Sequence, residues 1–200
     1  MKRTGLLLAM MFVSAGLWAQ TTAGSISLAG GLEYSSNKSE NVYGNVDYSS
    51  SSLNFRPSAG YFVIDNLEVG LQLGIGSGKS QYEGSAETKN STFQVGPFAR
   101  YYKFTSNERF AFTGTLSFQI GSGTSSTGQN ELKTGSTSVS LVPGFTYFLS
   151  DKWALDFQLQ GIGFTSYDPN KDVDNNNQNT FTFGASSLSP SLGFRFFITK

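Results

Sequence analysis

The protein has 200 residues, with 14 basic and 14 acidic side chains and neither cysteine nor histidine. Without cysteine there is no disulfide framework and no thiolate site. Without histidine, Ser-His hydrolases, histidine acid–base chemistry and most zinc sites are excluded. Lysine and arginine do not form the basic cluster that a nucleic-acid partner requires.

Residues 1–19 have the layout of a secretory signal peptide. A basic pair comes first, then an apolar run that ends at Val13, then small residues up to Ala19, where we expect cleavage. The apolar run is too short to cross a bilayer as a helix, which disfavours the alternative of a retained membrane helix. Removing the two basic residues leaves 12 against 14 acidic ones, a net charge of −2, on a single exported domain of residues 20–200.

The rest of the chain alternates between apolar and polar residues in eight segments, and each segment predicts a strand. Helical periodicity of comparable length is not found, and no run of 18 apolar residues could form a transmembrane helix. Prolines within four segments argue against central strands of an ordinary sheet, so we expect local irregularities there. The segments are 24–34, 52–63, 67–77, 92–103, 109–121, 137–149, 153–164 and 187–199.

The connections between these segments alternate in length. The short ones are 64–66, 104–108 and 150–152, and the long, polar ones are 35–51, 78–91, 122–136 and 165–186. A soluble sandwich has no reason for such strict alternation, whereas a barrel of the outer membrane has short periplasmic turns and long external loops. The predicted fold is therefore all-β, an eight-stranded antiparallel up-and-down transmembrane β-barrel.

The polar side of the predicted strands carries small and amide residues, no lysine, and six charges. A solvent-exposed sheet face would carry more charge, so we expect this side to line a narrow lumen in which arginines pair with carboxylates. Four charges lie near the short turns and two lie higher, which predicts two stacked layers of ion pairs with Arg100 as the partner of Glu68. The six charges are Glu33, Arg56, Glu68, Arg100, Asp156 and Arg195.

The apolar side carries aromatic residues near the short turns, one or two on each of six predicted strands. Such a ring is typical of an aromatic girdle at a membrane interface, which implies that the apolar side faces outward. The alternative is the core plug of a soluble barrel. The predicted girdle is Tyr61, Tyr101, Phe110, Phe112, Tyr147, Trp153 and Phe196, with Tyr34, Phe93 and Phe164 as weaker candidates at the other end.

Several stretches resemble the family of eight-stranded outer-membrane β-barrels of the OmpX and OmpA transmembrane-domain type, above all those of Bacteroidetes-like bacteria. They are PSAGYFVIDNLEVGLQLGIG, VGPFARYYKF, VPGFTYFLSDKWALDFQLQ and SPSLGFRFFITK, and the likeness extends over residues 20–200. The family has no catalytic motif. Many of its members end on an aromatic residue that the assembly machinery reads, whereas here three residues follow Phe197.

Three motifs invite a chemical interpretation. The sequence GSGKS resembles a phosphate-binding loop, but Leu73 stands where that loop needs glycine, and no apolar helical stripe follows. The loop that begins at Asp168 carries oxygen ligands at every second residue and is either a weak calcium site or a solvated loop. Glu68 and Asp156 could act as an acid and a base, but facing arginines favour structural pairing.

We therefore expect an integral barrel of the outer membrane of a Gram-negative bacterium, a closed scaffold whose lumen is filled by ion pairs. Its four external loops would serve adhesion, surface protection or binding. A narrow, porin-like transport barrel is the main alternative, disfavoured because side chains just fill an eight-stranded lumen. An outer-membrane enzyme that modifies lipids and a secreted lipocalin-like carrier are the remaining alternatives.

The sequence also predicts which partners the protein has. We expect no enzymatic activity, no cofactor and no metal. The expected partners are outer-membrane lipid, including lipopolysaccharide, and the machinery that assembles outer-membrane barrels. The protein is expected to be monomeric and to bind no nucleic acid.

Overall fold

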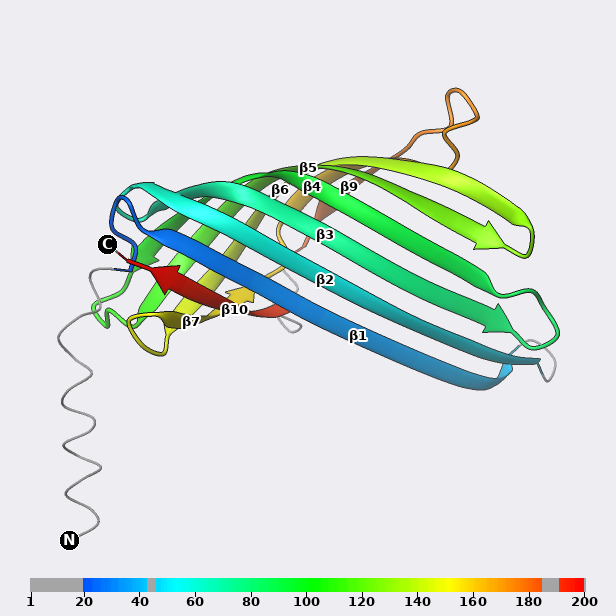
Figure 1. The fold of residues 1–200 in the computed structure, drawn as a ribbon, viewed down its shortest axis with the longest axis horizontal. Coiled ribbons are helices and arrows are strands. Elements are labelled where there is room, and N and C mark those ends of the chain that lie inside the picture. The colour runs from blue at the N-terminus through cyan, green and yellow to red at the C-terminus, as the bar shows by residue number, and fades with distance from the viewer. Residues whose placement is uncertain (1–19, 43–45, 185–190, 200) are drawn as a thin grey trace, which may run out of the picture.

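The computed structural model describes residues 20–42, 46–184 and 191–199, which form ten antiparallel strands (Figure 1). Residues 1–19 lie outside this part, so the signal peptide and its cleavage stay predictions. Within the described residues, no helix is long and apolar enough to cross a membrane. The strands are β1 (Ile26–Val42), β2 (Val46–Ile64), β3 (Leu67–Tyr82), β4 (Thr88–Phe104), β5 (Phe110–Thr127), β6 (Asn130–Phe148), β7 (Trp153–Gln158), β8 (Ile162–Asp168), β9 (Gln178–Phe183) and β10 (Ser191–Ile198).

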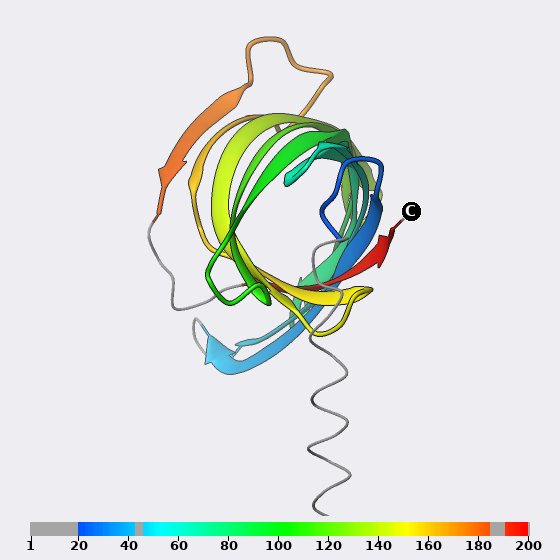
Figure 2. The ribbon, with the colours of Figure 1, turned by 90° about the vertical axis from the view of Figure 1, so that its left-hand side faces the viewer.

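These ten strands are the pieces of eight, because the seventh strand is divided into β7 and β8 and the eighth into β9 and β10. Neighbours along the chain pair antiparallel, and β10 pairs with β1 from Ile26↔Ile198 to Gly30↔Phe194, which closes the barrel. Figure 2 shows the resulting ring. The predicted eight-stranded antiparallel barrel is confirmed. Beyond Gly30, the described residues of β1 pair with β2 alone.

A β-bulge opposite Pro143 divides the seventh strand. β6 pairs with β7 up to Gln158 and with β8 from Ile162, so the three residues between them, 159–161, face only two residues of β6. Proline has no N–H to donate to a neighbouring strand, and its carbonyl accepts a hydrogen bond from Leu159 N at 2.9 Å. The irregularity expected at a proline is therefore present at this position.

The two ends of the barrel differ in their connections. One end, which we call the turn end, carries the three short connections together with residue 20 and the end of β10 (Figure 1). The opposite end, the loop end, was expected to carry four long loops. Much of 35–51, 78–91 and 122–136 is strand instead, and only the connection between β8 and β9, residues 169–177, is a long loop in the described part. Serine and threonine occupy both faces of these strand extensions, so no apolar alternation predicted them.

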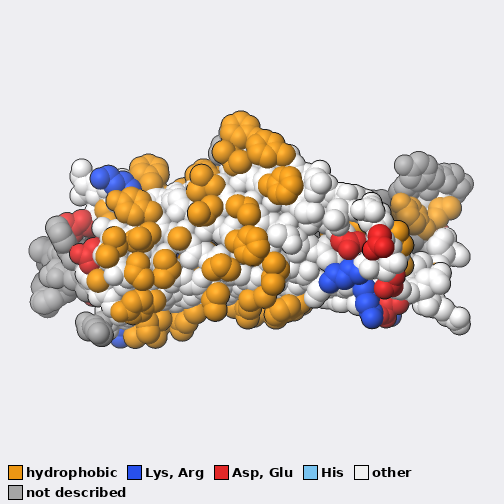
Figure 3. Space-filling model, turned by 90° about the horizontal axis from the view of Figure 1, so that it is seen from above, with side chains coloured by type: hydrophobic (Ala, Val, Ile, Leu, Met, Phe, Trp, Pro, Cys, Tyr) orange, Lys and Arg blue, Asp and Glu red, His pale blue; other side chains and the backbone are white. Residues whose placement is uncertain are grey.

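The outward face of the barrel is apolar, and its large side chains are open to the surroundings. Leu71 is 59% exposed and Phe112 57%, values that would be costly in water over so wide an area. Figure 3 shows the apolar side chains as a broad band, with charged side chains gathered beyond it. Other members of the band are Ile26, Leu28, Leu53, Phe55, Ile75, Leu116, Phe118, Ile120, Val139 and Leu141.

Candidate functional site

Four charged side chains form a buried network inside the barrel near the turn end. They are Glu68 on β3, Arg100 on β4, Asp156 on β7 and Arg195 on β10, and none is more than 6% exposed. Each lies on the polar parity of its strand, and strand alternation points that parity into the lumen. Two carboxylates and two guanidinium groups leave the network without net charge.

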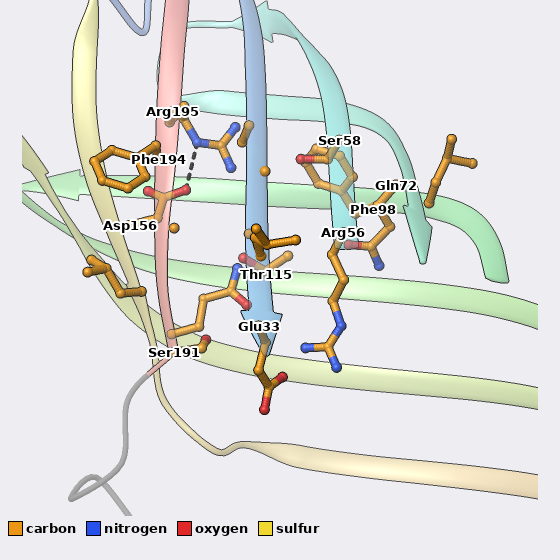
Figure 4. A pocket seen from close by; sticks show the side chains of 18 of the residues that line it. Glu33, Arg56, Ser58, Gln72, Phe98, Thr115, Asp156, Ser191, Phe194 and Arg195 are labelled. Atoms are coloured by element: carbon orange, nitrogen blue, oxygen red, sulfur yellow. Dashed lines mark hydrogen bonds and ion pairs between the residues drawn. The ribbon is translucent and has the colours of Figure 1, made fainter. Parts of the chain in front are cut away.

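Arg195 is the centre of this network. Its Nη1 donates to Glu68 Oε1 at 2.6 Å and to Ser27 Oγ at 2.7 Å, while its Nε donates to Asp156 Oδ2 at 2.8 Å. Ser27 donates in turn to the same oxygen of Glu68. Figure 4 shows the bond between Arg195 and Asp156. One guanidinium group thus connects β10 with β1, β3 and β7.

Asp156 is the second junction of the network. Its Oδ2 also accepts from Arg100 Nη1 at 2.7 Å, and its Oδ1 accepts from Thr146 Oγ1 at 2.6 Å. Arg100 donates through Nε to Thr115 Oγ1 at 2.9 Å. Buried charges are tolerated only when they are paired and their remaining hydrogen-bonding groups are satisfied, and these contacts meet that requirement.

Glu68 is paired with Arg195, so the prediction that Arg100 would be its partner is wrong. Glu68 and Arg100 are register neighbours on β3 and β4. The Glu68 side chain nevertheless extends toward β2, away from β4, and its carboxylate pairs with Arg195. Space explains this choice, because a Cβ at Gly60 on β2 would overlap the Glu68 carboxylate. The missing side chain at Gly60 lets Glu68 reach over β2 to Ser27 and Arg195.

An aromatic plug lies in the lumen beside the network, and we define it as Phe62, Tyr102, Phe148 and Phe197. All four side chains are 0% exposed. The Phe62 ring lies 5.6 Å from that of Tyr102 and 6.2 Å from that of Phe197, which is 5.5 Å from Phe148. The Tyr102 hydroxyl donates to Glu68 Oε2 at 2.7 Å, so the plug and the network are joined by a charge-assisted hydrogen bond.

Sequence reasoning missed the aromatic plug, although a signal for it exists. Each plug residue directly follows a residue of the predicted girdle, and strand alternation requires the two members of such a doublet to face opposite sides. One ring must therefore point into the lumen wherever its neighbour points outward. The four doublets are Tyr61-Phe62, Tyr101-Tyr102, Tyr147-Phe148 and Phe196-Phe197.

The chain before β1 covers the turn end. Gln20 is buried and donates through Nε2 to the carbonyl of Ser150 at 2.7 Å. Thr21 Oγ1 donates to Asn66 Oδ1 at 2.7 Å, and Asn66 N donates to Thr21 O at 2.8 Å. Asn66 has a φ of 66°, a left-handed conformation that asparagine tolerates in tight turns. Residues 20–21 are thus bonded to two of the short turns.

Above the network the lumen opens into a cavity of about 530 Å³. Arg100, Asp156 and Arg195 line its floor, and amides and hydroxyls line much of its wall. The expectation of a lumen filled by ion pairs is therefore correct only for the turn end. The wall residues with these groups are Asn54, Ser58, Gln72, Thr115, Gln119 and Gln158.

The expected upper layer of ion pairs is not formed. Glu33 and Arg56 both line the cavity and are exposed, and neither takes part in an ion pair within the described residues. In Figure 4 both side chains extend in the same direction, away from Asp156 and Arg195. They are two positions out of register, since Arg56 pairs with Gly31 and Glu33 with Asn54, and the wide lumen at this height leaves both groups room to reach water.

The sequence profile of the family described as outer membrane protein beta-barrel domain matches residues 5–188. The chain belongs to this family. It is accordingly an outer-membrane β-barrel protein, whereas an origin in Bacteroidetes-like bacteria stays a prediction. No curated protein matches the sequence.

Several solved barrels are similar to this outer-membrane barrel. Neisserial surface protein A is 17% identical, with 87% of this chain and 97% of that chain covered and a TM-score of 0.46. OprG from Pseudomonas aeruginosa is 14% identical, with 93% and 100% covered and a TM-score of 0.44. The N-terminal barrel domain of Pseudomonas aeruginosa OprF is 12% identical, with 88% and 98% covered and a TM-score of 0.44.

Outer-membrane barrels generally place short turns in the periplasm and long connections outside, so the turn end is expected to face the periplasm. The predicted girdle lies on the outward face near the turn end. Tyr61, Tyr101, Phe112, Tyr147 and Trp153 are exposed, while Phe110 and Phe196 are half-buried against aromatic neighbours. Contact of these rings with the membrane interface stays a prediction.

The remaining motifs of this outer-membrane barrel take ordinary structural roles. GSGKS lies within β3, which runs to Tyr82, so no loop is present to hold phosphate. In the loop after β8, Asp168 Oδ1 accepts from Asn170 N and Asn170 Oδ1 accepts from Asp172 N, each at 3.0 Å. Within the described chain, no three acidic side chains gather where they could hold a metal ion.

Proposed function

We propose that the protein is a non-conducting scaffold of the outer membrane that presents its strand extensions at the cell surface. The observation that supports this most directly is the obstruction of the lumen at the turn end. Glu68, Arg195 and Asp156 join strands on different sides of the barrel, and the aromatic plug fills the space beside them. A solute would have to break buried ion pairs to pass.

The surface-presenting role is supported by the strand extensions at the loop end. The hairpin of β5 and β6 stays paired as far as Thr127↔Asn130, well beyond the apolar band. Hydroxyl pairs strengthen such extensions, for example Ser91 with Thr124 and Thr88 with Thr127, each at 2.8 Å. Rigid polar hairpins suit contact with other molecules or shielding of the cell surface, and we expect no catalytic activity from them.

A narrow transport barrel is the second candidate, and the cavity of about 530 Å³ favours it. A small polar solute could enter that cavity from the outside without crossing the floor. Transport would then require the network around Arg195 to open, whereas a scaffold would keep it closed.

Conductance across planar lipid bilayers separates the two candidates. The purified full chain, refolded in lipid, is expected to produce no stepwise current, while a trimeric porin of known conductance serves as the positive control. Insertion is checked by the change in apparent mass on heating in gel electrophoresis, which reports a folded barrel. Reproducible single-channel steps from the folded protein would contradict the scaffold and support transport.

A further inference from the structure

The outward face of β1–β4 changes from apolar to charged within two rows of residues. The first row, the one nearest the turn end, is Leu32, Phe55, Ile75 and Phe93, which are register neighbours across the four strands. The next row toward the loop end is Tyr34, Leu53, Ser77 and Ser91. The third, which we call the lysine row, is Ser36, Ser51, Lys79 and Lys89. Successive rows are about 7 Å apart along a strand.

The lysine row contains a pair of like charges directly opposite each other. Lys79 on β3 and Lys89 on β4 are register partners on the same face, and both are exposed. Such a pair places the Cβ atoms about 5 Å apart and destabilises a sheet unless an anion lies between the ammonium groups. Lys79 has no ion pair within the described residues, so the sheet itself does not neutralise it.

Two carboxylates form ion pairs with lysines of this region, one with Lys89 and one with Lys38, and both hold their lysine weakly. Glu87 Oε1 is 3.3 Å from Lys89 Nζ, and Glu40 Oε1 is 3.5 Å from Lys38 Nζ on β1. The lysine side chains of these pairs are 68% and 67% exposed, and ion pairs in water contribute little. The three ammonium groups are therefore free to turn toward a stronger anion.

A hollow of about 440 Å³ lies over the same strands, and most of its lining residues occupy outward positions. Lys38, Lys79 and Glu87 supply its charges, and Ser36, Ser51 and Tyr34 supply hydroxyl groups. The hollow thus combines cations and hydroxyls directly above an apolar wall. An amphiphile with phosphates, sugar hydroxyls and acyl chains would fit this arrangement, with its phosphates at the lysines, its hydroxyls at the serines and its acyl chains on the apolar rows.

We propose that the lysine row and this hollow bind the phosphorylated disaccharide of the outer-leaflet glycolipid, the lipid A part of lipopolysaccharide. Lys79 and Lys89 contact a phosphate, the serines contact sugar hydroxyls, and the acyl chains lie on Phe55 and Ile75. A soluble anion would use only the lysines, so the apolar rows below them favour a lipid. The proposal rests on the outward direction of the loop end, which is part of the proposed function.

Native mass spectrometry of the full chain in mild detergent tests the site, with diphosphoryl lipid A as the probe. The variant K79S/K89S replaces both lysines by the residue type that surrounds them and is expected to bind lipid A about 30-fold more weakly. The variant K103S/K152S makes the same charge change at the turn end and is expected to stay within about twofold of the wild type. Each variant must show the heat-dependent mass change of a folded barrel.

Three further measurements make the result specific. Lipid A without phosphates should bind the wild type weakly and be insensitive to K79S/K89S, and inorganic phosphate should compete poorly. The variant E87Q removes a competing carboxylate and should strengthen binding several-fold. Equal binding by K79S/K89S, an equal loss in K103S/K152S, or weaker binding by E87Q would each overturn the proposal. None of these outcomes would affect the conductance result, so the scaffold hypothesis is judged separately.

Discussion

Charged side chains that point into the lumen are held differently at the two ends of the barrel. Near the turn end, Glu68, Arg100, Asp156 and Arg195 are buried and joined into one network. Toward the loop end, Glu33 and Arg56 line the cavity at inward positions, yet neither forms an ion pair with another described residue. The charged groups are of the same types at both ends, so their register and their surroundings decide whether an ion pair forms.

Two features of the surroundings differ. At the turn end the aromatic plug and residues 20–21 exclude water, so an unpaired charge would be costly and pairing follows. At the loop end the cavity leaves room for water, and an exposed pair would contribute little against the entropy of holding two long side chains. Charge pairing in this barrel therefore follows the packing of uncharged neighbours.

The largest expected difference in stability is between two variants that each lack one arginine, one at the turn end and one at the loop end. Arg195→Gln leaves two buried carboxylates without their shared partner and should lower the free energy of unfolding by about 3–5 kcal/mol. Arg56→Gln, the matched change at the loop end, should alter it by less than about 0.5 kcal/mol. Urea titration in lipid vesicles, followed by the heat-dependent mobility shift, measures both, and equal losses would refute the contrast.

A smaller effect is expected where the aromatic plug meets the network. Tyr102→Phe removes the hydroxyl that donates to Glu68 and should cost about 1.5–3 kcal/mol, as hydrogen bonds to charged groups do. Tyr101→Phe is the control, because this neighbour faces outward and is 52% exposed. It should be nearly neutral in the same urea titration. A neutral Tyr102→Phe would mean that the plug and the network are independent.

A substitution at Gly60 tests whether the space beside Glu68 determines its ion-pair partner. Gly60→Ala adds a methyl group where the Glu68 carboxylate lies, so the carboxylate must move away from Arg195, at a cost of about 1–3 kcal/mol. Gly114→Ala is the matched control, since a Cβ there meets no atom within 4 Å. The same unfolding measurement applies, and a stable Gly60→Ala barrel with an unchanged Glu68–Arg195 pair would disprove the steric explanation.

The last prediction concerns water access and involves little change in stability. The chain has no cysteine, so single-cysteine variants report their own positions. Arg56→Cys should react readily with a water-soluble maleimide added outside folded vesicles, because this position lines the cavity. Ala111→Cys, which lies in the buried core, should react only after urea unfolding. Rapid labelling of both folded variants would show that the turn end is also open to water.

Much of the fold could be predicted because alternation survives wherever one face is apolar. It predicted eight strands and the inward position of the charges from Glu33 to Arg195. The strand extensions could not be predicted, because water wets both of their faces and removes the alternation. The partner of Glu68 could not be predicted either, since it depends on the small residue Gly60 one strand away and not on Arg100, the adjacent register position.

The aromatic doublets have a consequence for how the strands find their register during assembly. If β2 slipped by one residue, Tyr61 and Phe62 would exchange sides and an aromatic ring would still occupy each face. The rings therefore cannot distinguish correct from slipped pairing. The same slip in β3 or β10 would turn Glu68 or Arg195 outward, away from every partner in the buried network and toward the lipid, where a charged side chain destabilises a barrel. The buried charges thus act as a register check, which rejects pairings that the aromatic residues would accept.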